Sequence, residues 1–137
     1  MSKLAVAITT KTSEENPVIL DIGANVGLFT KAFMKAPKTP KSIIAIEPSF
    51  YVFSILLNIT ANMPSVRCCK VALSHETATV DLKTPLKKSG ALRVGLSHIG
   101  NANNQQVFVE TVDAKRLDDV LTDEKVDQVD IVKLDVE

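Results

Sequence analysis

The chain has 137 residues, a common size for one domain, and 45% of them are hydrophobic, so a sizeable core is possible. Its 16 basic and 16 acidic side chains balance, which argues against a general nucleic-acid binder, because such a protein needs excess positive charge. No apolar run approaches membrane-spanning length.

The two cysteines, Cys68 and Cys69, are neighbours. On a strand they would point to opposite faces, so they suggest no disulfide framework. Without a nearby His or Cys cluster they also make no convincing metal site. A reducing compartment fits them best, and we expect a cytoplasmic protein.

We expect an N-terminal extension over residues 1–16 and a single domain over residues 17–137. The domain opens with a short apolar run from Val18, followed by the acidic Asp21, and this run predicts a buried strand. A tight turn with two glycines, Gly23 and Gly27, follows. Next comes a helical pattern whose apolar residues share one face: Leu28, Phe29, Ala32, Phe33 and Ala36. In open α/β sheets, a nucleotide-like ligand binds at such a strand–turn–helix unit.

The spacing of the glycines narrows the class of ligand. The dinucleotide fingerprint needs glycine at its first, third and sixth positions. Counted from Gly23, these positions hold Gly23, Asn25 and Leu28. Two of the three positions fail, so the pattern disfavours a nicotinamide or flavin dinucleotide.

A second apolar run, Ser42–Ile46, predicts another buried strand, and it ends at Glu47. An acidic residue about 20 positions after the glycine turn can accept hydrogen bonds from both ribose hydroxyls. The alternative for Glu47 is a solvated charge at a strand end. Ser49 then predicts the N-cap of a helix. We expect five residues of that helix to face the sheet: Phe50, Phe53, Leu56, Leu57 and Ala61.

Further elements follow along the chain. Residues 65–74 predict a third strand running into a loop, and residues 78–83 and 106–112 alternate like the strands of an inserted hairpin. The polar stretch 84–105 between them predicts a long loop. His98 in that loop has the chemistry of a general base, although a lone loop histidine is more often solvated. Residues 116–121 predict a short amphipathic helix, and residues 129–137 another strand.

Asp21-x-Gly23-x-Asn25-x-Gly27 resembles motif I of the S-adenosylmethionine-dependent methyltransferases, and it is most similar to the FkbM family of O-methyltransferases. The Leu-Asp-Asp helix and the strand that ends in Asp135-Val136-Glu137 also resemble the FkbM pattern. The landmarks occur in the family's order over residues 18–137. This joint match is far more specific than any one motif.

The resemblance implies an α/β fold: a Rossmann-like open, mostly parallel sheet with strand order 3-2-1-4, helices on both faces and an inserted β-hairpin. The family's complete fold has seven core strands, so we expect its C-terminal half to be missing here. The fourth strand would then be a sheet edge, with the apolar Ile131, Val132 and Leu134 available for self-association.

The resemblance also implies a function: methyl transfer from S-adenosylmethionine to a hydroxyl of a small molecule such as a sugar or a polyketide. The residues it assigns to cofactor binding are Asp21, Gly23, Asn25, Gly27, Glu47, Ala72 and Asp135, with Glu137 a weaker candidate. For Ala72 a place in the hydrophobic core is an equal alternative. No catalytic base can be named.

Two other functions stay open. One is a nicotinamide-dependent Rossmann oxidoreductase, which the broken fingerprint disfavours. The other is a non-catalytic half-domain that acts as a binding or assembly module through its open strand edge.

Overall fold

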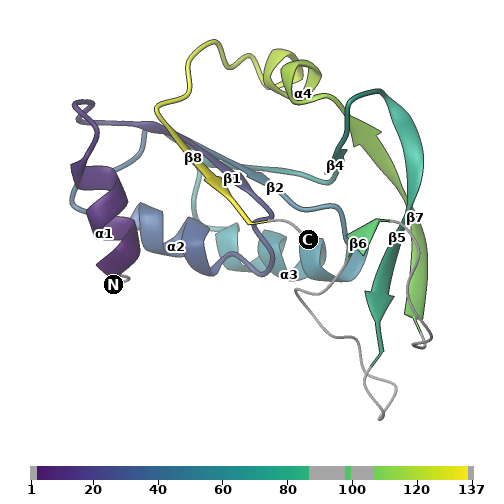
Figure 1. Ribbon diagram of the computed structural model, residues 1–137. Coiled ribbons are helices and arrows are strands. Elements are labelled where there is room, and N and C mark those ends of the chain that lie inside the picture. The colour runs from purple at the N-terminus through teal and green to yellow at the C-terminus, as the bar shows by residue number, and fades with distance from the viewer. Residues whose placement is uncertain (1–2, 87–97, 100–106, 136–137) are drawn as a thin grey trace.

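The computed structural model describes residues 3–86, 98–99 and 107–135 (Figure 1). The helices in these ranges are α1 Lys3–Thr10, α2 Leu28–Met34, α3 Phe50–Thr60 and α4 Leu117–Asp123. The strands are β1 Val18–Ile22, β2 Ser42–Ile46, β3 Val66–Cys69, β4 Ala72–Leu73, β5 Ala78–Pro85, β6 His98–Ile99, β7 Val107–Lys115 and β8 Ile131–Leu134.

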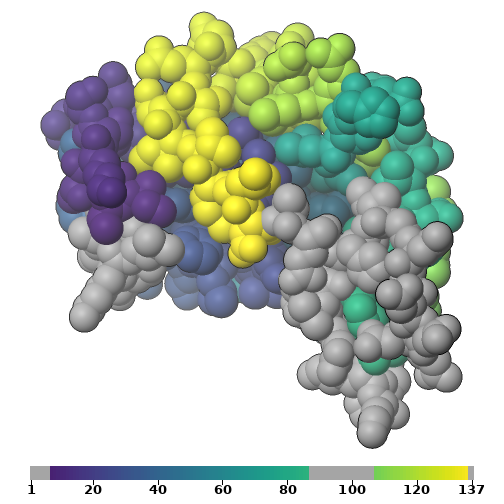
Figure 2. All heavy atoms as spheres, viewed as in Figure 1, coloured from purple at the N-terminus to yellow at the C-terminus, as the bar shows by residue number. Residues whose placement is uncertain are grey.

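The main sheet is a parallel, four-stranded sheet in the order β3-β2-β1-β8. The second predicted strand has the expected bounds, the first forms at the expected apolar run, and β8 is the fourth core strand, beside β1. The expected strand order 3-2-1-4 is therefore confirmed. Within the described residues β8 lies at the end of this sheet, where Val132 and Leu134 are exposed, whereas Ile131 is buried. Figure 2 shows the segment that contains β8, in yellow, uncovered on the face in view.

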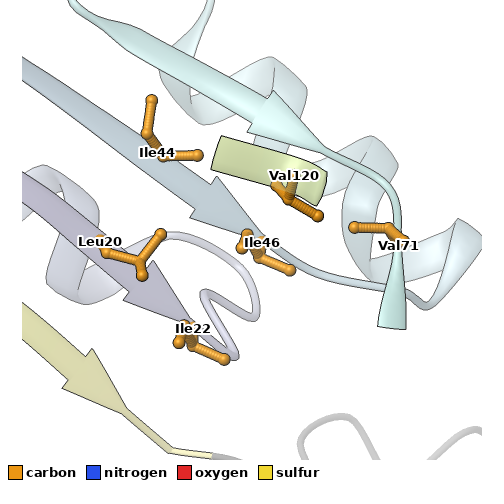
Figure 3. Packing of buried hydrophobic residues seen from close by; sticks show 6 residues of the cluster. All are labelled: Leu20, Ile22, Ile44, Ile46, Val71 and Val120. Atoms are coloured by element: carbon orange, nitrogen blue, oxygen red, sulfur yellow. The ribbon is translucent and has the colours of Figure 1, made fainter. Parts of the chain in front are cut away.

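Side chains of the central strands alternate between two covered faces, because successive residues of a strand point to opposite sides. Ile19 and Ile43 pack with Phe33 of α2 on one face. On the other face Val120 of α4 packs in a cluster with Leu20, Ile22, Ile44, Ile46 and Val71 (Figure 3). Figure 1 shows α1, α2 and α3 on one side of the sheet and α4 on the opposite side. Helices on both faces are thus confirmed.

The expected hairpin is also confirmed, and it belongs to a second sheet in the order β4-β7-β5-β6. Strands β5 and β7 pair antiparallel over their length. The predicted third strand is split between the sheets, since Val66–Cys69 joins the main sheet and Ala72–Leu73 pairs with β7. His98 lies in β6, paired with β5, and not in an uninterrupted loop as expected.

The buried face of α3 differs from the expectation. Val52, Leu56 and Thr60 are buried, whereas Phe50 and Leu57 are exposed. Most residues of this helix are apolar, so more than one stripe has helical spacing, and only packing against the sheet selects one. In α2, Leu28 is likewise 72% exposed, because it stands at the first position of the helix, beyond the sheet that Phe33 covers.

The residues expected to form an N-terminal extension include α1, which packs against α2. Ile8 contacts the cluster around Phe33, and Thr9 is fully buried. The boundary at residue 17 stays a prediction. None of the helices in the described ranges combines the length and apolar character needed to cross a bilayer.

Candidate functional site

The turn between β1 and α2, residues 23–27 and hereafter the glycine loop, has three residues with positive φ. These are Gly23 at 72°, Asn25 at 53° and Gly27 at 90°. Glycine adopts such angles freely, and asparagine tolerates them better than most other residues. The backbone N–H groups of Gly23 and Ala24 both donate to the carbonyl of Ile46, at 3.0 Å each. The end of β2 therefore holds the start of the loop.

Gly27 lies against α3. A Cβ at this position would stand 2.9 Å from Cδ1 of Leu56 and 3.5 Å from Cγ2 of Ile59. Gly27 is one of the residues that the family resemblance assigns to cofactor binding. In the structure its missing side chain makes room for α3, and any contact with a cofactor stays a prediction.

Glu47 directly follows β2 and lies beside the glycine loop. Its Oε2 accepts the N–H of Asn25 and its Oε1 accepts the N–H of Ser49, both at 3.0 Å. Burial raises the pKa of this carboxyl, the two backbone N–H groups oppose the shift, and the nearby charge of Glu110 adds to it. The carboxylate is thus fixed beside the loop with one backbone donor on each oxygen.

Asp21, at the base of the loop, is fully buried. Its Oδ2 accepts a 2.6 Å hydrogen bond from the hydroxyl of Thr30 in α2. Nζ of Lys133 in β8 lies 3.2 Å from Oδ1 as an ion pair, and the same ammonium donates to the carbonyl of Gly23 at 2.9 Å. Oδ1 has no hydrogen bond among the described residues, so we treat its contact with Lys133 as electrostatic.

Sequence reasoning missed Lys133 and Thr30. Their contacts with the loop join residues far apart in the chain, and nothing in the local pattern points to them. For Lys133 one indirect sign was available. A buried aspartate needs a positively charged partner, and Lys133 is a charged residue between apolar ones on a predicted strand.

The side chain of Asn25 places a second buried oxygen in the loop. Its Oδ1 has no hydrogen-bond partner among the described residues. Buried polar atoms are nearly always paired in native proteins. A ligand with an amino or hydroxyl donor would satisfy this atom, which fits the amino and hydroxyl groups of S-adenosylmethionine.

Of the remaining predicted site residues, Ala72 packs in a different cluster, Asp135 lies at the exposed edge of the site beside Lys133, and Glu137 is outside the described ranges. Ala72 is buried in the core of the second sheet, with Leu82, Val112 and Ala114. Asp135 follows β8, where its backbone N–H donates to Ile22 and its carboxylate is 3.8 Å from Lys133 and 74% exposed. The cofactor contacts assigned to these residues stay predictions.

A hollow of about 190 Å³ lies elsewhere, between the end of β3 and α4. Its lining includes Cys69, Val71, Lys115, Val120 and Glu124, and none of the glycine-loop residues. Burial, and then the charge of Glu124, raise the pKa of the Cys69 thiol to about 12. A protonated thiol is a poor nucleophile, so this hollow offers no activated cysteine.

Comparison with known proteins defines the class to which this fold and site belong. Residues 21–137 match the model of the methyltransferase FkbM domain, so the chain belongs to the FkbM methyltransferase family. It is similar to methyltransferase sdnD of Sordaria araneosa. The identity is 28% over an alignment of 148 positions, which covers 89% of this chain and 57% of that protein.

The fold is also similar to the crystal structure of methyltransferase FkbM from Methylobacillus flagellatus KT. The TM-score is 0.59 and the sequence identity 14%, and the match covers 90% of this chain and 26% of that one. At this identity the likeness concerns the fold alone. The chain thus spans little more than half the length of its curated relative and about a quarter of this structural one.

Proposed function

We propose that this chain forms the S-adenosylmethionine-binding part of a methyltransferase that acts on a hydroxyl oxygen of a small molecule, such as a sugar or a polyketide. The observation that carries the proposal is the Glu47 carboxylate. It is buried at the end of β2 and bound by the backbone N–H groups of Asn25 and Ser49. Membership of the FkbM methyltransferase family supports the same reaction class.

The hydrogen-bonding capacity of Glu47 fits a ribose. Each oxygen of an ionised carboxylate has about two lone-pair sites, and backbone donors occupy one on each oxygen. One acceptor site on each oxygen is therefore left for the two neighbouring ribose hydroxyls. Asn25 adds a buried acceptor in the same loop, which fits a ligand amino or hydroxyl group.

The bound cofactor would supply the activated methyl group on its sulfonium. The chain's own residues would bind it, orient it and keep water away. In this proposal the glycine loop approaches the cofactor with its backbone, Asp21 keeps the loop in shape, and Asp135 stands near the reacting end. We assign no residue the role of catalytic base.

We further propose a reducing compartment, the cytoplasm, as the location. Cys68 and Cys69 are free thiols. Cys68 contacts Thr60 of α3 and Cys69 contacts Glu124 beyond α4, so they point to opposite faces of the main sheet and do not face each other.

The test is a calorimetric titration with S-adenosylhomocysteine and, separately, with NAD. We expect S-adenosylhomocysteine to bind more tightly than NAD. Glu47→Gln should weaken the binding by about tenfold or more, because an amide accepts at one atom only and carries no charge. Glu76→Gln is the matched control, since Glu76 is an exposed glutamate whose ion pair, among the described residues, is with its neighbour His75. Tighter binding of NAD, or equal affinity of the wild type and the Glu47→Gln variant, would overturn the proposal.

A further inference from the structure

Lys133 is the feature of this site that neither the glycine motif nor the acidic residue at β2 accounts for. It lies on β8, its side chain is only 11% exposed, and its ammonium contacts the glycine loop. We propose that Lys133 is a positioning residue, which holds the glycine loop in its ligand-binding shape from the neighbouring strand. The link to cofactor binding rests on the function proposed above.

The first step of the argument concerns charge. Asp21 is fully buried, and a buried carboxylate without a compensating charge is strongly disfavoured. Among the described residues, Asp21 forms one ion pair, the 3.2 Å contact with Lys133. Thr30 supplies a hydroxyl, which stabilises the carboxylate but cannot neutralise it. Lys133 therefore supplies the positive charge that compensates the buried Asp21 carboxylate at the base of the loop.

The second step concerns the loop backbone. Gly23 has its N–H bound to Ile46 of β2 and its carbonyl bound to Lys133 of β8. The peptide units on both sides of Gly23 are thus held by the two strands that flank β1. This matters because Asn25, two residues later, has positive φ, and a non-glycine residue in this sparsely populated region persists only where its surroundings hold it.

The third step concerns what orients the lysine itself. Its ammonium lies 5.1 Å from the centre of the Phe29 ring, a cation–π distance, so the first turn of α2 covers it. Asp135 lies 3.8 Å away on the exposed side. The ammonium thus stands between the loop, α2 and the end of β8. If any of these elements moved, the ammonium would move with it, and its hydrogen bond to the Gly23 carbonyl would change.

A counter-ion role alone and a positioning role predict different results when both charges are removed. In the double variant Asp21→Asn/Lys133→Met no buried charge is left uncompensated, and an asparagine there can still accept from Thr30. The fold should therefore be kept, as judged by the thermal unfolding midpoint. The Gly23 carbonyl would nevertheless have lost its lysine donor.

The experiment measures amide hydrogen exchange in wild type, Lys133→Arg and the double variant. We expect the Ala24 and Asn25 amides to exchange about tenfold faster in the double variant, which is the size of effect of losing a hydrogen bond from a charged donor. The amides of β2 should be unchanged, and Lys133→Arg should lie closer to wild type than the double variant. Lys31→Met, an exposed lysine in α2, is the matched control.

Affinity for S-adenosylhomocysteine is measured on the same proteins, and we expect it to fall about tenfold in the double variant and to be partly restored in Lys133→Arg. A folded double variant whose loop amides exchange at the wild-type rate would overturn the positioning role. If the wild type binds no S-adenosylhomocysteine, the proposed function fails, whereas the exchange rates still decide whether Lys133 holds the loop.

Discussion

At the scale of single residues, the two carboxylates of the site differ in their surroundings. Asp21 is fully buried and bound within the protein by Thr30 and Lys133. Among the described residues, the hydrogen bonds of Glu47 come from backbone N–H groups, one on each oxygen, which leaves acceptor sites on both. We therefore interpret Asp21 as the residue that holds the loop and Glu47 as the residue that meets the ligand.

The sequence predicts that both acids belong to the site, because Asp21 lies near the end of one buried strand, before the glycine turn, and Glu47 directly follows the next strand. It could not predict their different partners. Lys133 approaches Asp21 from β8, at the other end of the chain, and only the sheet register brings Asp21 opposite Lys133. A contact of this kind depends on the tertiary structure.

Gly27→Ala should destabilise the fold. The residue has φ of 90°, and a Cβ there would lie 2.9 Å from Cδ1 of Leu56. Overpacking and an unfavourable φ together should lower the free energy of unfolding by about 1–3 kcal/mol. Urea unfolding measures this change. Leu28→Ala is the control, since Leu28 is 72% exposed and should change stability by about 0.5 kcal/mol or less. Equal stability of the two variants would refute the packing role given to Gly27.

At the scale of elements, the second sheet contacts the site through the start of α3. Ser49 occupies the predicted N-cap position, but its side chain makes no capping hydrogen bond. Instead, the Glu110 carboxylate of β7 accepts the N–H of Phe50, at 3.1 Å from its Oε2. An acidic group at a helix N-terminus satisfies a free N–H and interacts favourably with the helix dipole. Glu110 thereby ties β7 to the helix that follows Glu47.

Glu110→Gln should change the pH dependence of ligand binding. The pKa of Glu47 is raised, chiefly by burial and in part by the charge of Glu110. Because the folded-state pKa lies above the unfolded one, the ionised carboxylate costs stability, and stability rises as the pH falls through the raised pKa. Binding of a ribose needs the ionised form, so affinity for S-adenosylhomocysteine should fall over the same range.

In Glu110→Gln the like charge is gone, so the pKa of Glu47 should be lower and the loss of affinity should begin at a lower pH. A carbon-13 titration of the Glu47 carboxyl, together with calorimetry at several pH values, measures both effects. Glu76→Gln should leave both unchanged. An unaltered Glu47 titration in Glu110→Gln would contradict the coupling between these two carboxylates.

Strands β1 and β2 were predicted well from sequence, because their apolar runs are short, rich in β-branched residues and followed by turn signals. The buried face of α3 was not predicted correctly. Its apolar residues lie on all sides of the helix, so only packing against the sheet determines which of them are buried. The split after β3 was also missed. Residues 70–71 carry the chain from the main sheet to the second one, and no glycine or proline marks this change between residues 66 and 73.

At the scale of the whole molecule, the strand order followed from resemblance to a family and not from the strands themselves. Apolar runs predict that strands form, but the order 3-2-1-4 depends on how the crossovers are arranged in space. The sheet order β3-β2-β1-β8 agrees with the arrangement that the family resemblance implies. Self-association through β8, where Val132 and Leu134 are exposed, stays a prediction.

The central claim is that the glycine loop and Glu47 form the cofactor site. The most direct test is a nitrogen-15 chemical-shift titration of this chain with S-adenosylhomocysteine. We predict that the largest shifts occur at the amides of Gly23, Asn25 and Ser49, and that the β5–β7 amides move little. Saturating ligand that leaves these three amides unmoved, or that shifts mainly residues around the hollow beside α4, would contradict the claim.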